Sequence, residues 1–153
     1  MQILGTSNVR QFLLASLFIL LGTLGLAVYQ FSLPRLTPTH TITVGKATFA
    51  VTKALTSAEQ EQGLSRVAYL APNQGMLFIF PQASRYAFWM KGMRFALDMI
   101  WIENEKVVAI TANAEPASYP SIIQPPTPVH QVLEVRAGTV AREGITVGST
   151  VHE

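Results

Sequence analysis

The segment Phe88-Trp89-Met90-Lys91 carries the residues best suited to bind a ligand. In an extended strand successive side chains point to opposite faces, so Trp89 and Lys91 share one face and Phe88 and Met90 share the other. We assign Phe88 and Met90 to the core, because an ammonium group resists burial. Trp89 could then stack on a flat ligand while Lys91 contacts an anion. In the alternative interpretation Trp89 is simply packed and Lys91 forms a structural ion pair with Asp98.

Three further charged residues, Arg66, Asp98 and Glu134, lie within or beside apolar runs. Isolated charges in such places must find partners. Arg66 could bind a carboxylate or phosphate through two parallel hydrogen bonds, or it could brace Glu134, which lies in an apolar strand and needs a partner if it is buried. We therefore predict that Arg66, Trp89, Lys91, Asp98 and Glu134 cluster in space and that any activity resides in this cluster.

Several common catalytic patterns are missing from the sequence. The chain contains no Cys, which excludes a disulfide framework, a thiolate nucleophile and a Cys-based zinc site. His130 has no Cys, Asp or Glu nearby at ligand spacing, so we predict no metal. Phosphate loops and dinucleotide fingerprints are absent, and we predict no cofactor. A paired-carboxylate hydrolase stays open, because Asp98, Glu134 and Glu143 could converge and sequence does not give their separation.

The composition is apolar and nearly neutral. Hydrophobic residues make up 49% of the 153 residues and charged residues 13%, against about 25% charged residues in an ordinary soluble domain. The first 34 residues hold one charged side chain, Arg10, and without it 10 Lys and Arg stand against 9 Asp and Glu. The sequence has no run of Lys and Arg, so we predict no nucleic-acid partner.

The segment Phe12–Phe31 is an uncharged apolar run. As a helix rising about 1.5 Å per residue it would span about 30 Å, the thickness of the bilayer core. We predict a signal-anchor at residues 1–33, a linker at 34–40 and a β-rich domain at 41–153. Arg10 beside the apolar run places this domain outside the cytoplasm, periplasmic or extracellular. A signal peptide cleaved after Ala27, which would release the domain, is the alternative.

The remainder of the chain reads as an α+β domain that is mainly β. Runs of strand length are expected at residues 41–44, 46–52, 75–80, 85–90, 99–102, 106–112, 129–135 and 145–151. A capping box of Thr56 and Glu59 predicts a short helix that ends at Gly63, and one helical turn is expected at Thr139–Arg142. The runs 99–102 and 106–112 flank Asn104, which can take a positive φ, so they are expected to form a hairpin. Five prolines between residues 116 and 128 predict a long loop. These elements make a small barrel-like or half-barrel sheet, antiparallel or mixed, with one or two short helices.

Alternation within the strands predicts the core. Residues that recur with period two should supply much of one core: Met76, Phe78, Phe80, Phe88, Met90, Ile100, Ile102, Val108 and Ile110.

Four segments occur in order and at close spacing: GLSR at residues 63–66, GMLFIF at 75–80, FWMK at 88–91 and LDMIWI at 97–102. With these segments, residues 41–152 resemble the DUF192 family, also called UPF0127. The resemblance implies a small, β-rich protein that is secreted or membrane-anchored, and it implies no reaction. Many members read Asn-Thr after FWMK and then a Pro before Leu-Asp, whereas this chain has Gly92, Met93 and Ala96. The loss of two hydrogen-bonding side chains weakens a catalytic role for this loop.

Two functions follow from these patterns. The first is a ligand-binding or interaction module, tethered to the membrane by its amino-terminal helix and binding a small molecule or an envelope component. The alternative is an envelope-associated hydrolase that uses the carboxylates of Asp98 and Glu134. A cleft that holds two carboxylates, one with a raised pKa, would favour the hydrolase, and an exposed Trp89 without such a pair would favour binding.

Overall fold

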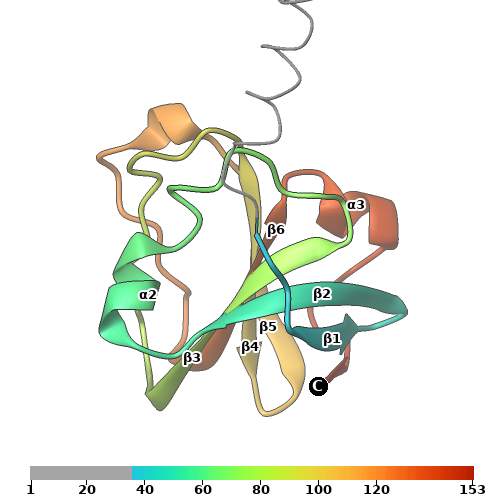
Figure 1. Ribbon diagram of the computed structural model, residues 1–153. Coiled ribbons are helices and arrows are strands. Elements are labelled where there is room, and N and C mark those ends of the chain that lie inside the picture. Colours follow the sequence, from blue (N-terminus) through green and yellow to red (C-terminus); the bar gives the residue numbers. More distant parts are fainter. Residues whose placement is uncertain (1–35) are drawn as a thin grey trace, which may run out of the picture. The chain divides into compact units, whose positions relative to one another are not determined.

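The computed structural model describes residues 36–153. Within them seven strands form one sheet (Figure 1). The strands are β1 (His40–Val44), β2 (Ala47–Ala54), β3 (Gln74–Ser84), β4 (Leu97–Glu103), β5 (Lys106–Ala114), β6 (Val129–Arg136) and β7 (Val151–His152). The connections contain α2 (Ser57–Gln62), the 3-10 helix η1 (Pro116–Ser118) and α3 (Thr139–Glu143). The helices α2 and α3 lie on different sides of the sheet (Figure 1).

The sheet is mixed and strongly curved. Its strand order is β5-β4-β6-β3-β2-β1-β7. Strands β2 and β3 run parallel and are joined by a crossover through α2, whereas the other neighbouring strands run antiparallel. The first and last strands of this order meet, because the backbone N–H of Val107 donates to the Ser149 carbonyl at 3.0 Å and that of Val151 donates to the Glu105 carbonyl at 2.8 Å. The predicted barrel-like or half-barrel sheet with two short helices is confirmed.

Apolar side chains are buried on both faces of the sheet. The inner cluster draws on all seven strands and consists of Ile42, Val44, Ala47, Phe49, Val51, Leu77, Ile100, Ile102, Val107, Leu133, Val135, Ile145 and Val151. The outer cluster lies on the other face, under α2 and the long loops, and consists of Ala54, Leu64, Val67, Leu70, Met76, Phe78, Phe80, Met90, Leu97, Met99, Trp101, Ala114, Val129 and Val132.

The predicted helix start, helix end and hairpin turn are all present in the structure. The Thr56 hydroxyl accepts the backbone N–H of Glu59 at 3.3 Å, and the Glu59 carboxylate accepts the N–H of Thr56 at 2.9 Å, which completes the capping box. Hydrogen bonds to the Glu59 carboxylate lower its pKa, and the largest contribution comes from the backbone N–H of Thr56. Gly63 ends the helix and has a positive φ of 48°. Asn104 lies in the turn of the β4–β5 hairpin and has a positive φ of 49°.

The predicted strand at residues 85–90 does not form. This segment is a loop held by one isolated bridge, in which Phe88 and Ile123 exchange backbone hydrogen bonds of 2.9 Å. Ile123 belongs to the proline-rich loop, and the prolines that follow it have no N–H to extend a ladder. The largest boundary differences lie in two other strands: β3 continues past Pro81 through an irregular register, and the closing strand is only Val151–His152.

The single predicted core is in fact divided between the two clusters. Met76, Phe78, Phe80 and Met90 belong to the outer cluster, with Phe88 and Val108 packed against it. Ile100 and Ile102 belong to the inner cluster, with Ile110 packed against it. Period two assigns residues of a regular strand to a common face, but pairing decides which face is shared between strands. The register shift between β4 and β5 also interrupts the alternation, so Val108 and Ile110 of one strand pack against different clusters. Here Met99 and Trp101, not Ile100 and Ile102, share the outer face with Phe78.

Residues 36–153 contain no helix that is long and apolar enough to cross a membrane. The predicted anchor, Phe12–Phe31, and the alternative cleavage point at Ala27 lie outside the described residues.

Candidate functional site

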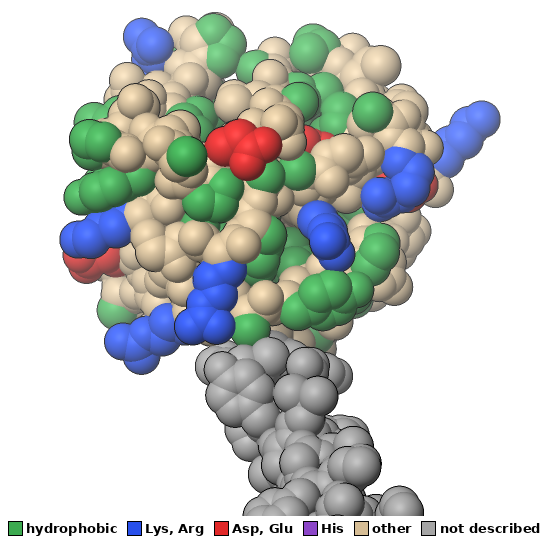
Figure 2. Space-filling view, turned by 90° about the horizontal axis from the view of Figure 1, so that it is seen from above, with side chains coloured by type: hydrophobic (Ala, Val, Ile, Leu, Met, Phe, Trp, Pro, Cys, Tyr) green, Lys and Arg blue, Asp and Glu red, His purple; other side chains and the backbone are tan. Residues whose placement is uncertain are grey.

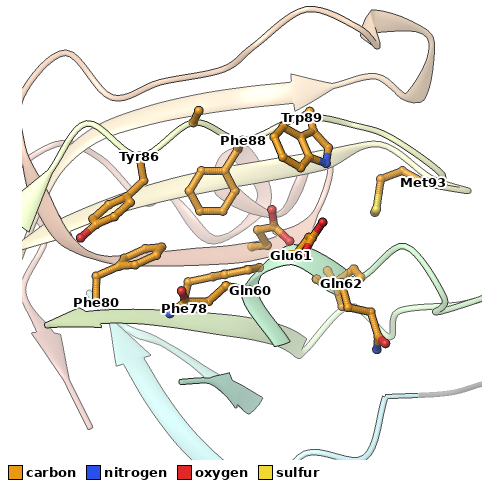
Figure 3. A pocket seen from close by; sticks show the side chains of 13 residues that line it. Gln60, Glu61, Gln62, Phe78, Phe80, Tyr86, Phe88, Trp89 and Met93 are labelled. Atoms are coloured by element: carbon orange, nitrogen blue, oxygen red, sulfur yellow. The ribbon is translucent and has the colours of Figure 1, made fainter. Parts of the chain in front are cut away.

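A cavity of about 180 Å³ opens on the outer face of the sheet beside α2 (Figure 3). One wall is α2 and its end, and another is β3 together with the loop that follows it. In Figure 3 the rings of Tyr86, Phe88 and Trp89 stand opposite those of Phe78 and Phe80. The cavity is lined by Gln60, Glu61, Gln62, Gly63, Leu64, Phe78, Phe80, Tyr86, Ala87, Phe88, Trp89, Met93 and Glu134.

Aromatic packing fixes the walls of this cavity. Phe88 meets Phe78 edge to face with ring centroids 5.1 Å apart, and it meets Trp101 in the same way at 5.4 Å. Tyr86 stacks on Phe80 at 3.6 Å, and its hydroxyl donates to the Gln82 carbonyl at 2.7 Å. Such pairs add about 0.5–1.5 kcal/mol each beyond their burial. The loop after β3 is therefore held in place by its rings, although it forms no strand.

The predicted alternation around Trp89 is present in this loop. Met90 is buried and Phe88 is half-buried against the outer cluster, whereas Trp89 is 44% exposed and Lys91 is exposed. Trp89 thus lines the cavity while presenting part of its ring to solvent.

Glu134 brings a carboxyl group to the cavity from the middle of the sheet. It lies on β6 directly opposite Met76 of β3 and Met99 of β4, two members of the outer cluster. The residue is only 5% exposed. Within residues 36–153, every fully buried side-chain oxygen has a hydrogen-bond partner. The Glu134 carboxyl group forms no hydrogen bond or ion pair with these residues, so its oxygens are not fully buried. They are accessible from the cavity.

Burial determines the charge of this carboxyl group. Removal from water penalises the ionised form and raises the pKa of Glu134 from 4.5 to about 8. At neutral pH the group is mostly protonated, so it can donate a hydrogen bond as well as accept one.

The predicted brace between Arg66 and Glu134 is not found. Arg66 is exposed and lines a neighbouring cavity between α2 and β2, which also includes Lys53 and Glu59. Among the described residues Arg66 forms no ion pair with Glu134. A buried carboxyl group can instead be neutralised by a proton, and this makes a cationic partner unnecessary.

Asp98 lies on the opposite face of the sheet from Glu134. Asp98 is opposite Val135 on β6, one residue along from Glu134, so the two side chains point to different faces. Asp98 is 1% exposed. Its carboxylate accepts the backbone N–H of Asn113 and that of Val140, both at 2.9 Å. Asp98 therefore ties β4 to β5 and to the start of α3.

The five predicted site residues are thus only partly brought together. Trp89 and Glu134 line one cavity, Arg66 lines the next, and Asp98 lines a third beside α3. Lys91 lines none of these three, and in residues 36–153 it forms no ion pair with Asp98. Lys and Arg side chains are spread singly over the face in Figure 2.

The described residues offer no metal centre. Within residues 36–153 no group of His, Asp and Glu side chains is arranged to hold a metal ion. The His130 ring nitrogen Nδ1 lies 2.9 Å from the Glu103 carboxylate, which also accepts the His130 backbone N–H at 2.7 Å. This contact joins β6 to β4 at the surface.

Comparison with known proteins identifies the family. The DUF192 family model, described as "Uncharacterized ACR", matches residues 40–152. The chain belongs to the DUF192 family. A structure from Sinorhizobium meliloti 1021, described as a proposed transcription regulator, is 32% identical, with a TM-score of 0.71 over 78% of this chain and 97% of that chain. A protein of unknown function from Novosphingobium aromaticivorans DSM 12444 is 29% identical, with a TM-score of 0.68 over 77% and 94%. A search of curated proteins gave no significant match.

The DUF192 domain also contains a site residue that the sequence analysis missed. Glu61 of α2 lines the same cavity as Glu134. The capping box predicts the helix, but no sequence pattern identifies Glu61 as a site residue. The packing of α2 on β3 determines which side chains of the helix face the cavity. Phe78 and Phe80 were predicted as core residues, and they also form the cavity wall.

Proposed function

We propose that this DUF192 domain binds a small molecule in the outer cavity, with Glu134 as its polar anchor. The observation that carries this proposal is a buried carboxyl group that has no hydrogen-bond or ion-pair partner among residues 36–153 and opens into an aromatic-lined cavity. Buried polar groups are nearly always hydrogen-bonded, and the cavity is where water or a ligand can supply the hydrogen bond that Glu134 needs. Binding sites are typically apolar cavities with a few polar groups, and groups with a displaced pKa concentrate there.

The exposed ring of Trp89 supports the same proposal. Trp89 is the one residue of the cavity that combines a large aromatic surface with 44% exposure. Burying that surface against a ligand would add apolar stabilisation of about 25 cal/mol per Å². We propose that Trp89 covers the bound ligand while Glu134 fixes its polar group.

Replacing Trp89 with Ala tests this role. We expect a ligand found by thermal-shift screening of the full-length chain to lose at least about tenfold in affinity in Trp89→Ala, because the covering ring is gone. The screen would use sugars, anions, amines and cell-wall fragments, since a bound ligand raises stability with its concentration. Tyr69→Ala is the matched control, because Tyr69 is 50% exposed and does not line the cavity. Equal loss in both variants would contradict the proposal.

We further propose that the domain is tethered to the membrane with its binding cavity outside the cytoplasm. The uncharged run Phe12–Phe31 beside Arg10 motivates this part of the proposal. A reporter fused at Glu153 should be active only as an exported protein, and the chain should sediment with membranes. Reporter activity in the cytoplasm would reverse the orientation, and a shortened soluble form would indicate cleavage near Ala27.

An envelope-associated hydrolase is the second candidate, and one observation favours it. The cavity is lined by two carboxyl groups, the exposed Glu61 and the buried Glu134 with its raised pKa. Two carboxyl groups in one site, one of them with a raised pKa, can serve as general acid and as base or nucleophile. The pair first expected, Asp98 with Glu134, is divided by the sheet. Product formation from a bound envelope fragment, lost in both Glu61→Gln and Glu134→Gln, would select the hydrolase.

A further inference from the structure

Resting on the proposed binding function, we infer that the ligand of the outer cavity is a small organic cation, an ammonium group that is recognised by the aromatic rings and by Glu134. The inference begins with the charges that line the cavity. Two carboxyl groups, Glu61 and Glu134, face it, and none of its lining residues is Lys, Arg or His. An anionic ligand would meet no cationic side chain there, and the charged residues that it would meet are both glutamates. A cationic ligand would find a counter-ion at the buried end of the cavity.

The aromatic walls favour the same class of ligand. An ammonium group is attracted to the face of a Trp, Tyr or Phe ring, and cages of several rings recognise alkylated ammonium groups. Five rings line this cavity, from Phe78, Phe80, Tyr86, Phe88 and Trp89. The ring of Trp89 is the most exposed of the five, and Trp is the strongest partner for a cation.

The size of the cavity limits the ligand to a small group. Its volume is about 180 Å³, whereas sites for drug-sized ligands measure about 300–1,000 Å³. An ammonium group with short alkyl substituents fits, whether it is a free amine or the head group of a larger molecule.

Binding of a cation would exchange a proton for the ligand. Glu134 is held neutral by burial, and a cation beside it favours the ionised form. The groups around Glu134 do not oppose this exchange: β3 and β4 contribute Met76 and Met99, and α2 contributes Glu61. The loop after β3 contributes the ring of Tyr86, whose hydroxyl donates to the Gln82 carbonyl, and Arg66 faces the neighbouring cavity. Affinity for a permanent cation should therefore rise with pH.

Calorimetric titration of the full-length chain tests the inference with a matched pair of ligands. Choline carries a permanent positive charge, and 3,3-dimethyl-1-butanol has the same shape without it. The chain is kept in a polyoxyethylene detergent, which carries neither an ammonium group nor a sugar. We expect choline to bind at least about tenfold more tightly than the alcohol at pH 9, and to bind at least about tenfold more tightly at pH 9 than at pH 6.

Two variants assign the effect to its residues. Glu134→Gln keeps the shape of the protonated side chain and should abolish the pH dependence of choline binding, together with at least about tenfold of its affinity at pH 9. Trp89→Ala changes an exposed ring and should weaken choline binding at both pH values. Glycerophosphocholine that binds more tightly than choline would assign the ammonium to a lipid head group, and weaker binding would assign it to a free amine.

Three results would overturn the inference. The first is equal affinity for choline and the alcohol, and the second is choline binding that does not change between pH 6 and 9. In the third, a sugar or an anion binds in a way that depends on Trp89 while choline does not bind, which leaves the proposed binding function standing and refutes the cation. If no ligand of any class binds, both the proposed function and the inference fail.

Discussion

Replacing Glu134 with Gln should raise the free energy of unfolding at pH 8 and above by up to about 5 kcal/mol, while leaving it nearly unchanged at pH 5. The folded state holds the proton of Glu134 up to a pKa of about 8, whereas the reference value is 4.5. Between these values the unfolded chain releases the proton and the folded chain keeps it, so each pH unit lowers stability by about 1.4 kcal/mol.

The sign of the effect follows from which state binds more protons. Below pH 4.5 both states are protonated, and the stabilising contribution of neutral burial is fully present. It is lost progressively as the pH rises to about 8, above which Glu134 ionises in both states. The total of about 5 kcal/mol is an upper value, because water in the cavity reduces the desolvation penalty on the ionised carboxylate. It is comparable with the whole stability of a small domain, which is about 5–15 kcal/mol.

Urea unfolding of the full-length chain and of Glu134→Gln at several pH values from 5 to 9 measures this effect. The difference between the two proteins removes the contributions of all other titrating groups, which the two chains share. Glu59, whose pKa is lowered, acts on the acid side, where stability falls as the pH falls, and it cancels in the same way. A difference that stays constant from pH 5 to 9 would contradict a neutral, buried Glu134.

Replacing Phe78 with Ala should lower the free energy of unfolding by about 3–5 kcal/mol. Phe78 is 1% exposed and belongs to the outer cluster. Its ring meets Phe88 edge to face, and it lies close behind Gly63, where a Cβ atom would be 3.5 Å from the Phe78 Cζ atom. Loss of the ring would therefore leave a void between β3, the end of α2 and the loop that carries Phe88.

Urea unfolding at a single pH near 6 gives the change for Phe78→Ala. Leu55→Ala serves as the control, because Leu55 is 59% exposed and its truncation should change stability by less than about 0.5 kcal/mol. A loss below about 1 kcal/mol in Phe78→Ala would mean that the outer cluster does not stabilise the fold as its burial indicates.

The features that depend on neighbouring residues could be predicted from local sequence signals. Thr56 and Glu59 specify the start of α2 through hydrogen bonds that span three residues, and Asn104 supplies the positive φ that the β4–β5 hairpin requires. The alternation of Trp89 with Met90 was also readable, because an extended backbone points successive side chains in opposite directions whether or not a strand forms. The order of motifs was sufficient to point to the family.

Which side chains share a site depends on long-range strand pairing and packing. Asp98 and Glu134 both lie in apolar strands, but the register between β4 and β6 sets Asp98 opposite Val135, and a shift of one residue would have reversed its face. Glu61 reaches the cavity because α2, which lies in the crossover between the parallel strands β2 and β3, packs against β3. No short sequence pattern predicts this packing. Register and packing depend on residues far apart in the sequence, because the pairing must bury the apolar side chains on both faces of the sheet. For that reason the residues of the site could be named from the sequence only in part, and their grouping could not.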